Sequence, residues 1–396
     1  MHIKLLAALN RPTTSGGIST ANVSKDKAYA VYGVETGVNT IVAELFRITK
    51  HNVTSIRSVA GDFEYNRVYG GRANSLFNRF TLLQAAPTNK ARIRVLDTEL
   101  TVLNERIFDD YVSSTNSLRG GYFSPDGHFI VLSYVDDSDL TIIRVINSFT
   151  LQDYANIRLA GIVTEVKFLY DRTIILSNAQ GTFATPTAPF TLRTYRVASN
   201  ALSLINSVFI PQVDKIHFRK DDIYVGTALA LVPDQLSIYT FGPTSGLDTD
   251  GAELRLYRGE KLELIATRNL DYNVNAVPYT DEDTILLAQS LPGQGEFFVF
   301  ARTDDRLGLD VRTVPKADLR NVSSAVSEKI LFRVGDSQVG LNNVLFYQIK
   351  VENHCSEPKL GTTKPLGIPT LVKAIPRTSV PKILLTDGSK DKRKKK

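Results

Sequence analysis

A degenerate repeat of short apolar strands constrains this sequence more than any other feature. Its clearest copy is Phe123–Ser133, followed by Asp136–Val145 and Phe149–Leu151, and it reads as turn, strand, polar loop, strand, short turn and strand. The turn at Pro125–Gly127 has a mechanism, because Pro sets the first turn dihedral and Gly accepts the positive one. Self-similarity along a chain predicts a repeat architecture.

The same order of elements recurs along most of the chain, and counting the first copy there are seven units. They are spaced roughly 44 to 60 residues apart, which is a spacing typical of repeat folds. The further copies are Val23–Tyr32 with Ile41–Ile48, Phe80–Leu83 with Ala91–Leu96 and Leu100–Leu103, Lys167–Ser177 with Phe190–Val197 and Leu202–Val208, His217–Gly226 with Gln235–Phe241, Val277–Leu287 with Glu296–Phe300, and Ala325–Phe332 with Val344–Ile349.

The strands of several units are apolar on both faces, for example Ile130–Leu132 and Ile174–Leu176. A small sheet of this kind hides both faces only by packing between two like neighbours. No stretch shows sustained helical periodicity, so alternating strand–helix domains are not expected. We predict an all-β fold, a seven-bladed β-propeller of four-stranded antiparallel blades. A sandwich or a solenoid would also contain many short strands.

The segment Phe123–Gly127, with Leu140–Val145 after it, resembles the repeat of seven-bladed propellers of the WD40-like and lactonase-like superfamily. As architecture the resemblance covers most of residues 20–352. The sequence departs from true WD40 repeats, since it contains no Trp and no Gly-His pair. The resemblance therefore implies the fold alone, and no functional residue is carried over from it.

Three regions are expected: a propeller over residues 1–355, a Pro-rich extended strap over residues 356–389 and a disordered basic tail over residues 390–396. The last blade needs a closing strand. The N-terminal strand around His2–Leu9 could supply it, and Thr370–Ile375 and Lys382–Leu385 are the alternatives.

The net charge of +6 resides mainly in the tail, whose seven residues hold six bases and one Asp. Such a segment is too charged to pack. It is either a solubilising end or an electrostatic hook for nucleic acid, an acidic partner, an anionic membrane surface or a nuclear import receptor. The candidate partner-binding residues are Lys390, Lys392, Arg393, Lys394, Lys395 and Lys396.

Catalytic motifs are lacking in the sequence. There is no Gly-x-Ser-x-Gly, and the five His show no metal-binding spacing. Cys355 follows His354 and is expected to be inert, while the pairs Gly16–Gly17 and Gly70–Gly71 precede no helix and predict no phosphate cradle. No catalytic residue and no cofactor are therefore assigned.

Acidic clusters offer the better case for a ligand. Asp136–Asp139, Asp248–Glu253 and Asp281–Asp283 could bind a divalent cation, or they could serve as ordinary turn residues. Arginines also recur at the ends of the third strands, where they could line one face of the ring or pair with acidic neighbours. They are Arg47, Arg94, Arg144 and Arg196.

These observations favour a non-catalytic binding or assembly scaffold with protein partners, including a structural role in a virion. The alternative is a lactonase-like hydrolase with a metal or acidic site at the central channel. The apolar stretch Leu5–Leu9 is short for a secretion signal, and no apolar run is long enough for a membrane span. An intracellular or virion location is thus favoured over secretion.

Overall fold

The computed structural model describes the chain in segments. Backbone is described for residues 2–10, 18–24, 27–32, 41–49, 51–74, 76–182, 185–210, 230–232, 237–243, 252–270, 275–281, 284–291, 294–301, 322–326, 330–334 and 343–350. Side chains are described for residues 27, 29–31, 41–49, 51–74, 76–180, 191–209 and 259–264. The predicted strap (356–389) and tail (390–396) lie outside these ranges.

Regular structure in the described part is β-strand apart from one short 3-10 helix, η1 (Ser113–Thr115). The chain divides into one unit of Met1–Glu352 and another of Asn353–Lys396, and the strands that the structure describes belong to the first. Within the described ranges no helix is long and apolar enough to span a membrane.

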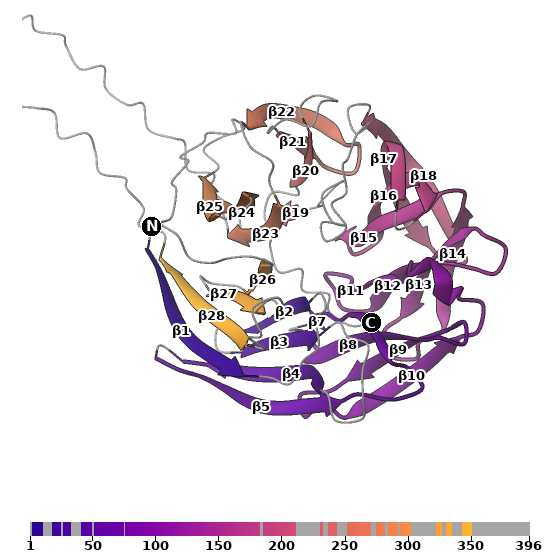
Figure 1. Ribbon diagram of the computed structural model, residues 1–396. Helices are drawn as coiled ribbons and strands as arrows, with labels where there is room; N and C mark the ends of the chain where they lie inside the picture. Colours follow the sequence, from indigo (N-terminus) through magenta and orange to yellow (C-terminus); the bar gives the residue numbers. More distant parts are fainter. Residues whose placement is uncertain are drawn as a thin grey trace, which may run out of the picture. The chain divides into compact units, whose positions relative to one another are not determined.

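The strands form small antiparallel sheets, each built mainly from consecutive strands (Figure 1). The first four sheets are β2 (Ile18–Ser24), β3 (Lys27–Tyr32), β4 (Ile41–Ile48) and β5 (Val53–Ala60); β6 (Arg67–Gly70), β7 (Ala73–Asn74), β8 (Arg79–Ala86), β9 (Lys90–Leu96) and β10 (Val102–Phe108); β11 (Arg119–Phe123), β12 (Phe129–Val135), β13 (Thr141–Asn147) and β14 (Asp153–Leu159); and β15 (Ile162–Tyr170), β16 (Thr173–Thr182), β17 (Thr185–Ala198) and β18 (Ala201–Ile210).

The later strands follow the same plan. They are β19 (Ala230–Val232), β20 (Ser237–Pro243), β21 (Ala252–Arg258) and β22 (Glu263–Leu270); β23 (Asn275–Asp281), β24 (Thr284–Leu291) and β25 (Gln294–Ala301); and β26 (Val322–Val326), β27 (Ile330–Val334) and β28 (Asn343–Lys350), joined by β1 (His2–Asn10). The strand β1 pairs antiparallel with β28, from His2 opposite Lys350 to Asn10 opposite Asn343.

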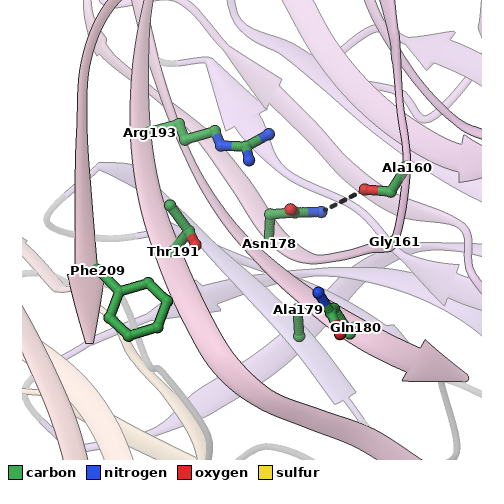
Figure 2. A pocket seen from close by; sticks show the side chains of 8 residues that line it. All are labelled: Ala160, Gly161, Asn178, Ala179, Gln180, Thr191, Arg193 and Phe209. Atoms are coloured by element: carbon green, nitrogen blue, oxygen red, sulfur yellow. Dashed lines mark hydrogen bonds between the residues drawn. The ribbon is translucent and has the colours of Figure 1, made fainter. Parts of the chain in front are cut away.

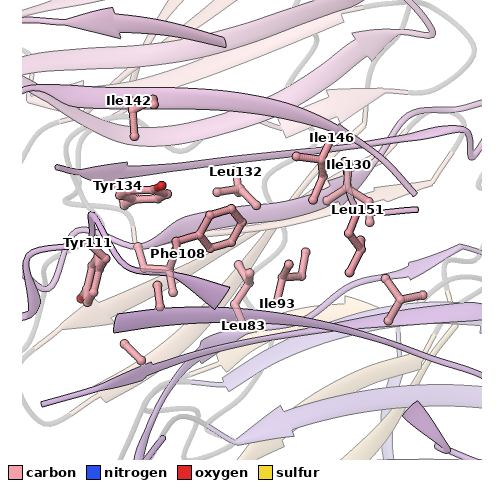
Figure 3. Packing of buried hydrophobic residues seen from close by; sticks show 14 residues of the cluster. Leu83, Ile93, Phe108, Tyr111, Ile130, Leu132, Tyr134, Ile142, Ile146 and Leu151 are labelled. Carbon is pink, nitrogen blue, oxygen red and sulfur yellow. The ribbon is translucent and has the colours of Figure 1, made fainter. Parts of the chain in front are cut away.

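Strand β12 shows why the sheets pack on both faces. Every residue from Phe129 to Val135 is buried. Ile130 and Leu132 belong to a core cluster shared with β8 and β9 of the preceding sheet (Figure 3), whereas Val131 belongs to a second cluster shared with β15 and β16 of the next. Alternate side chains of a strand point to opposite faces. The expectation of sheets buried on two sides is confirmed for this strand.

The turn between β11 and β12 forms as the sequence predicts. Gly127 has a φ of +73°, and its amide donates to the carbonyl of Ser124 at 2.8 Å. The Ser124 hydroxyl accepts a hydrogen bond from the amide of Phe129 at 3.0 Å. This bond joins the two ends of the turn where β12 begins. A Cβ at Gly127 would come closer than 3.0 Å to the Asn74 amide nitrogen, so this turn also rests against the preceding sheet.

One strand begins later than the sequence predicts. Leu100 was expected to start a strand, but it has a φ of +57° in a turn, and β10 begins at Val102. The carboxylate of Asp97 accepts the amides of Glu99 and Thr101 at 2.8 and 2.9 Å, which stabilises the turn. This prediction was therefore wrong by two residues, because a side-chain acceptor takes the backbone donors that a strand would use.

Candidate functional site

The first strands of three consecutive sheets, β6, β11 and β15, carry a concentration of basic and tyrosine side chains. Strand β11 contacts both β6 and β15, so the three strands are neighbours in space. With the segment that follows β6 they contribute four cations and one carboxylate among the residues described. We call this set the inner-strand site: Arg67, Tyr69, Arg72, Arg119, Tyr122, Glu165 and Lys167.

A tyrosine between two cations links all three sheets. The guanidinium of Arg72 lies 4.1 Å from the ring centre of Tyr122 and donates to its hydroxyl at 2.5 Å. The ammonium of Lys167 lies 5.2 Å from the same ring centre. Cations are attracted to the negative face of an aromatic ring, most strongly where water is partly excluded.

Lys167 also has a carboxylate partner, since it forms an ion pair with Glu165 on the same face of β15. Burial lowers the pKa of the Lys167 ammonium, but the neighbouring Glu165 carboxylate outweighs this effect and raises the pKa above its ordinary value. Lys167 therefore stays charged at neutral pH.

A second group lies on β6 and the segment before β11. Arg67 and Tyr69 both donate to the side-chain oxygen of Asn116, each at 2.9 Å. The guanidinium of Arg119 lies 5.9 Å from the ring centre of Tyr69. Asn116 has a φ of +51°, a conformation that Asn tolerates better than most residues, and this turn places its oxygen between the two donors.

Glycines allow the inner strands to approach their neighbours. A Cβ at Gly71 would come closer than 3.0 Å to the carbonyl of Thr81, and one at Gly120, with a φ of +99°, would come as close to the carbonyl of Val131. Thr81 itself donates to the Gly121 carbonyl at 2.8 Å and accepts the Arg72 amide at 2.9 Å. The pair at 70–71 thus has a packing role.

Sequence reasoning missed this site, although a signal was present. The strands β6 and β11 are short and rich in Gly, so they lack the alternation that marks a strand. Arg, Tyr and a Gly-Gly pair nevertheless occur together twice, in Arg67–Arg72 and in Arg119–Tyr122. Their recurrence in consecutive repeats could have identified both inner strands.

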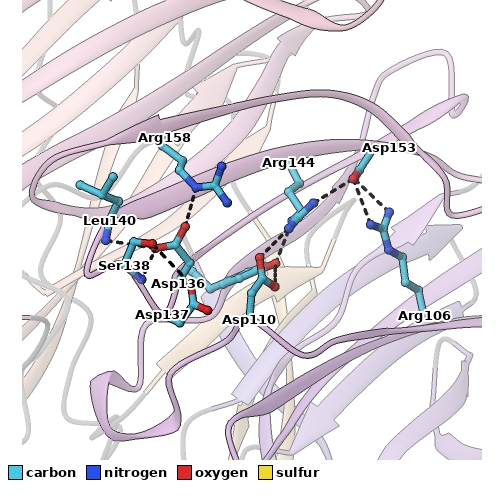
Figure 4. Close-up of polar contacts among 10 residues, drawn as sticks. Arg106, Asp110, Asp136, Asp137, Ser138, Leu140, Arg144, Asp153 and Arg158 are labelled. Carbon is cyan, nitrogen blue, oxygen red and sulfur yellow. Dashed lines mark hydrogen bonds and ion pairs between the residues drawn. The ribbon is translucent and has the colours of Figure 1, made fainter.

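Asp136, the buried residue of the acidic cluster Asp136–Asp139, has a structural function (Figure 4). Asp136 accepts the amides of Ser138 and Leu140 at 3.0 and 3.2 Å and the guanidinium of Arg158 at 2.6 Å. Burial raises the pKa of Asp136, but the hydrogen bonds donated by Arg158 and the two amides outweigh it and lower the pKa. Its oxygens are therefore already engaged as turn and ion-pair acceptors.

No three His, Cys, Asp or Glu groups come together as a metal-ligand set among the side chains that the structure describes. The side chains of Asp248–Glu253 and Asp281–Asp283 lie outside those ranges, as do Cys355, His354, His217 and the pair at 16–17. His128 packs against two aromatic rings, 5.6 Å from the ring centre of Phe77 and 5.8 Å from that of Phe149.

Three of the four arginines that recur on third strands pair with acidic neighbours. Arg94 contacts Glu105 at 2.6 Å, Arg144 contacts Asp110 at 2.7 Å, and Arg196 contacts Glu260 at 2.8 Å. Arg47 is exposed on β4. For Arg94, Arg144 and Arg196 the structure therefore shows the predicted pairing with acidic neighbours.

A separate depression of about 560 Å³ lies at the end of the sheet β15–β18 (Figure 2). One wall is the turn between β14 and β15, and the floor and rim come from β16, β17 and β18. Its lining residues are Ala160, Gly161, Asn178, Ala179, Gln180, Thr191, Arg193 and Phe209.

Comparison with known proteins identifies the fold and no family. No protein-family model matches the chain, and no curated protein matches it. A chain in the crystal structure of the mitotic checkpoint complex is similar over 88% of this chain and 96% of that one, at 12% identity and a TM-score of 0.58.

Two further structures are similar at the level of fold. The β-propeller domain of the Trilobed protease from Pyrococcus furiosus is similar over 83% of this chain and 94% of that one, at 10% identity and a TM-score of 0.53. Raptor from Chaetomium thermophilum is similar over 88% of this chain but 29% of that one, at 9% identity and a TM-score of 0.54. The chain therefore resembles β-propellers in fold, and the sequence-based resemblance is confirmed at that level.

Proposed function

We propose that this protein is a non-catalytic binding and assembly scaffold whose inner-strand site receives an acidic partner. The observation that carries the proposal is the charge of that site, where four cations accompany one carboxylate among the residues described on β6, on the segment that follows it, and on β11 and β15. Surfaces of one sign attract partners of the other and accelerate their encounter. A protein partner with an acidic segment fits this surface.

The interlocked sheets suit a scaffold. The contacts of Tyr122 with Arg72 and Lys167 join three sheets. Thr81 in β8 links its sheet to the sheets on either side: its hydroxyl donates to the carbonyl of Gly121, and its carbonyl accepts the hydroxyl of Tyr29 at 3.1 Å. A frame held in this way keeps binding side chains in position before the partner arrives, which lowers the entropy cost of binding.

The fold neighbours agree with a role in protein complexes. One of the similar structures is a chain from the crystal structure of the mitotic checkpoint complex, and that chain is therefore part of a complex. Propeller folds host many functions, so this agreement supports the proposal only at the level of class. A place in a virion, which the sequence suggested, remains a specific form of the same hypothesis, and proteomic analysis of purified particles would test it.

We also propose that the propeller has seven blades. The described strands form seven separate sheets, which supports this count, and the pairing of β1 with β28 joins the first and last strands of the described order in one sheet. In a propeller a pairing of this kind closes the ring and leaves only short, protected sheet edges. An experimental density map with seven radial sheets is the expected result, and six or eight would overturn the count.

The alternative of a lactonase-like hydrolase needs several oxygen ligands or carboxylates at the channel. The inner-strand site contains four cations and one carboxylate, Glu165, which is paired with Lys167. That donor set favours an anionic partner over a divalent cation. Metal analysis and a lactone hydrolysis screen of the purified protein would distinguish the two functions.

Binding of a fluorescein-labelled oligoglutamate peptide, followed by anisotropy at low salt, tests the proposal. We expect saturable binding that weakens about fivefold or more in an Arg67→Gln/Arg119→Gln variant, because two of the four cations are lost. The matched control is Arg57→Gln/Arg196→Gln, which removes the same charge from exposed positions on β5 and β17. Equal weakening in both variants, or no binding, would contradict the proposal.

The basic tail is a second, independent part of the hypothesis. Lys390, Lys392, Arg393, Lys394, Lys395 and Lys396 would add affinity for the same acidic partner or for nucleic acid. A variant that ends at residue 389 should lose binding to a double-stranded DNA probe. If the truncated variant bound that probe as strongly as the full chain, the tail would have no role in binding DNA.

A further inference from the structure

A second binding site lies apart from the inner strands, at the depression on the sheet β15–β18. We infer that this depression binds the carboxylate of an acidic peptide segment whose neighbouring side chain is apolar. The inference rests on the proposed function for the nature of the partner, a protein, but on different residues.

The register of the sheet brings the main residues of the site together. Asn178 on β16 lies opposite Thr191 on β17, and Thr191 lies opposite Phe209 on β18. Arg193 is two residues beyond Thr191 and therefore shares its face of the sheet. One row across three strands thus carries an amide, a hydroxyl and an aromatic ring, with a guanidinium beside it (Figure 2).

The wall opposite this row is rigid. Gly161 has a φ of +82°, and a Cβ there would come closer than 3.0 Å to the carbonyl of Ala179, so the turn lies directly against β16. The side chain of Asn178 is 7% exposed and donates to the carbonyls of Ala160 and Ile162 at 3.4 and 3.2 Å. These contacts fix the turn at 160–161 against β16.

Arg193 is the charged residue of the site. The other seven described lining residues are Ala, Gly, Asn, Gln, Thr and Phe, so the described lining carries one positive charge and no carboxylate. Within the described part of the chain Arg193 has no ion-pair partner, in contrast to Arg196 on the same strand, which pairs with Glu260. Arg193 lies opposite Leu176, which belongs to the buried core.

A guanidinium at the edge of an apolar core favours a planar anion. Arg presents parallel donors that match the two oxygens of a carboxylate, and partial exclusion of water strengthens the pairing. The Thr191 hydroxyl and the Gln180 amide, which also line the depression, supply further neutral donors. Their chemistry selects a carboxylate-bearing group.

The rim selects what stands next to that carboxylate. Phe209 is 56% exposed at the end of β18, so its ring is accessible at the rim of the depression. An apolar side chain adjacent to the acidic residue would cover this ring. The volume of about 560 Å³ suits two side chains of a peptide and lies in the range of small-ligand sites.

Saturation-transfer NMR with the dipeptide acetyl-Phe-Glu-amide tests the inference, with acetyl-Phe-Gln-amide as the uncharged comparison. We expect saturable binding of the Glu peptide and binding at least about tenfold weaker for the Gln peptide, since the charge-assisted pair is lost. In Arg193→Gln the two peptides should bind equally weakly, and Phe209→Ser should weaken both. Arg196→Gln is the matched control and should bind like wild type.

Two outcomes would overturn the inference. One is unchanged discrimination between the peptides in Arg193→Gln, with wild-type thermal unfolding of the variant. The other is preferential binding of phenyl phosphate over the Glu peptide, which would assign the site to a phosphate instead. The inner-strand variant Arg67→Gln/Arg119→Gln should retain dipeptide binding, so failure of this inference and failure of the proposed function give different results.

Discussion

The guanidinium of Arg144 on β13 holds the carboxylate of Asp110 at 2.7 Å, and Asp110 lies in the connection that follows β10 of the neighbouring sheet. The same guanidinium donates to the Tyr134 hydroxyl at 2.7 Å and to Asp153 at 2.8 Å, and Asp153 is also contacted by Arg106 of β10 (Figure 4). One side chain therefore ties two sheets together through three acceptors. The side chain of Arg144 is 12% exposed, so water replaces these contacts poorly.

Replacing Arg144 by Leu should lower the free energy of unfolding by about 3 kcal/mol, because it leaves Asp110 and Asp153 without their shared cation. Urea denaturation measures the change. The comparison is Arg57→Ala, whose ion pair with Glu99 is largely exposed, and this variant should change stability by no more than about 1 kcal/mol. Similar costs for the two variants would show that the Arg144 network is not a cohesive contact.

Asp136→Asn should destabilise the protein by about 1–2 kcal/mol at neutral pH, since a hydrogen bond between charged groups is lost while the turn keeps its acceptor. The pKa of Asp136 is lowered in the folded state, so its contribution is present above the unfolded pKa and disappears as the pH falls through the folded value.

The difference in stability between wild type and Asp136→Asn should consequently be constant above about pH 5 and shrink below the ordinary Asp pKa. Chemical denaturation at a series of pH values from neutral to acidic measures this difference. A difference that grows toward acid would contradict the assignment of the ionised carboxylate to the Arg158 pair.

Gly71→Ala should destabilise the protein by about 2–3 kcal/mol, because the new methyl group meets the Thr81 carbonyl and Val31 in the closely packed inner layer. Gly259→Ala is the comparison: its φ is +63°, but its nearest neighbour, the Tyr170 hydroxyl, is 3.9 Å away. It should cost about 1 kcal/mol from backbone strain alone. Thermal unfolding of both variants decides whether contact or conformation dominates.

Affinity for the oligoglutamate probe should fall about tenfold or more when salt rises from 50 to 500 mM, since exposed charge pairs are screened over shorter distances. The tail-truncated protein should retain most of this dependence if the inner-strand cations carry it. Anisotropy titrations at several salt concentrations measure the slope. A slope that vanishes with the tail would move the binding site from the inner strands to residues 390–396.

Local patterns determined much of the fold. The turn at Pro125–Gly127 and the apolar strands at Ile130–Leu132 and Ile174–Leu176 follow from turn chemistry and from the burial of both faces. Helical domains were not expected because no stretch shows sustained helical periodicity. These inferences need only neighbours in the sequence, so a single sequence supports them.

The inner strands and both candidate sites required the tertiary structure. Tyr122 lies about 50 residues along the chain from both Arg72 and Lys167, and the three side chains meet because consecutive sheets stack. Arg193 and Arg196 are the same residue type on the same strand, β17. Arg193 nevertheless lines a depression, whereas Arg196 pairs with Glu260, which lies in the turn between β21 and β22 of another sheet.

The sequence by itself determined that short strands with two buried faces must pack between like neighbours, since nothing else removes their apolar surface from water. Only the tertiary structure decided which cations share a surface and which are neutralised by a carboxylate. The physical reason is that pairing depends on distances of a few ångströms between residues far apart in the chain, and a period of strands and turns does not encode those distances.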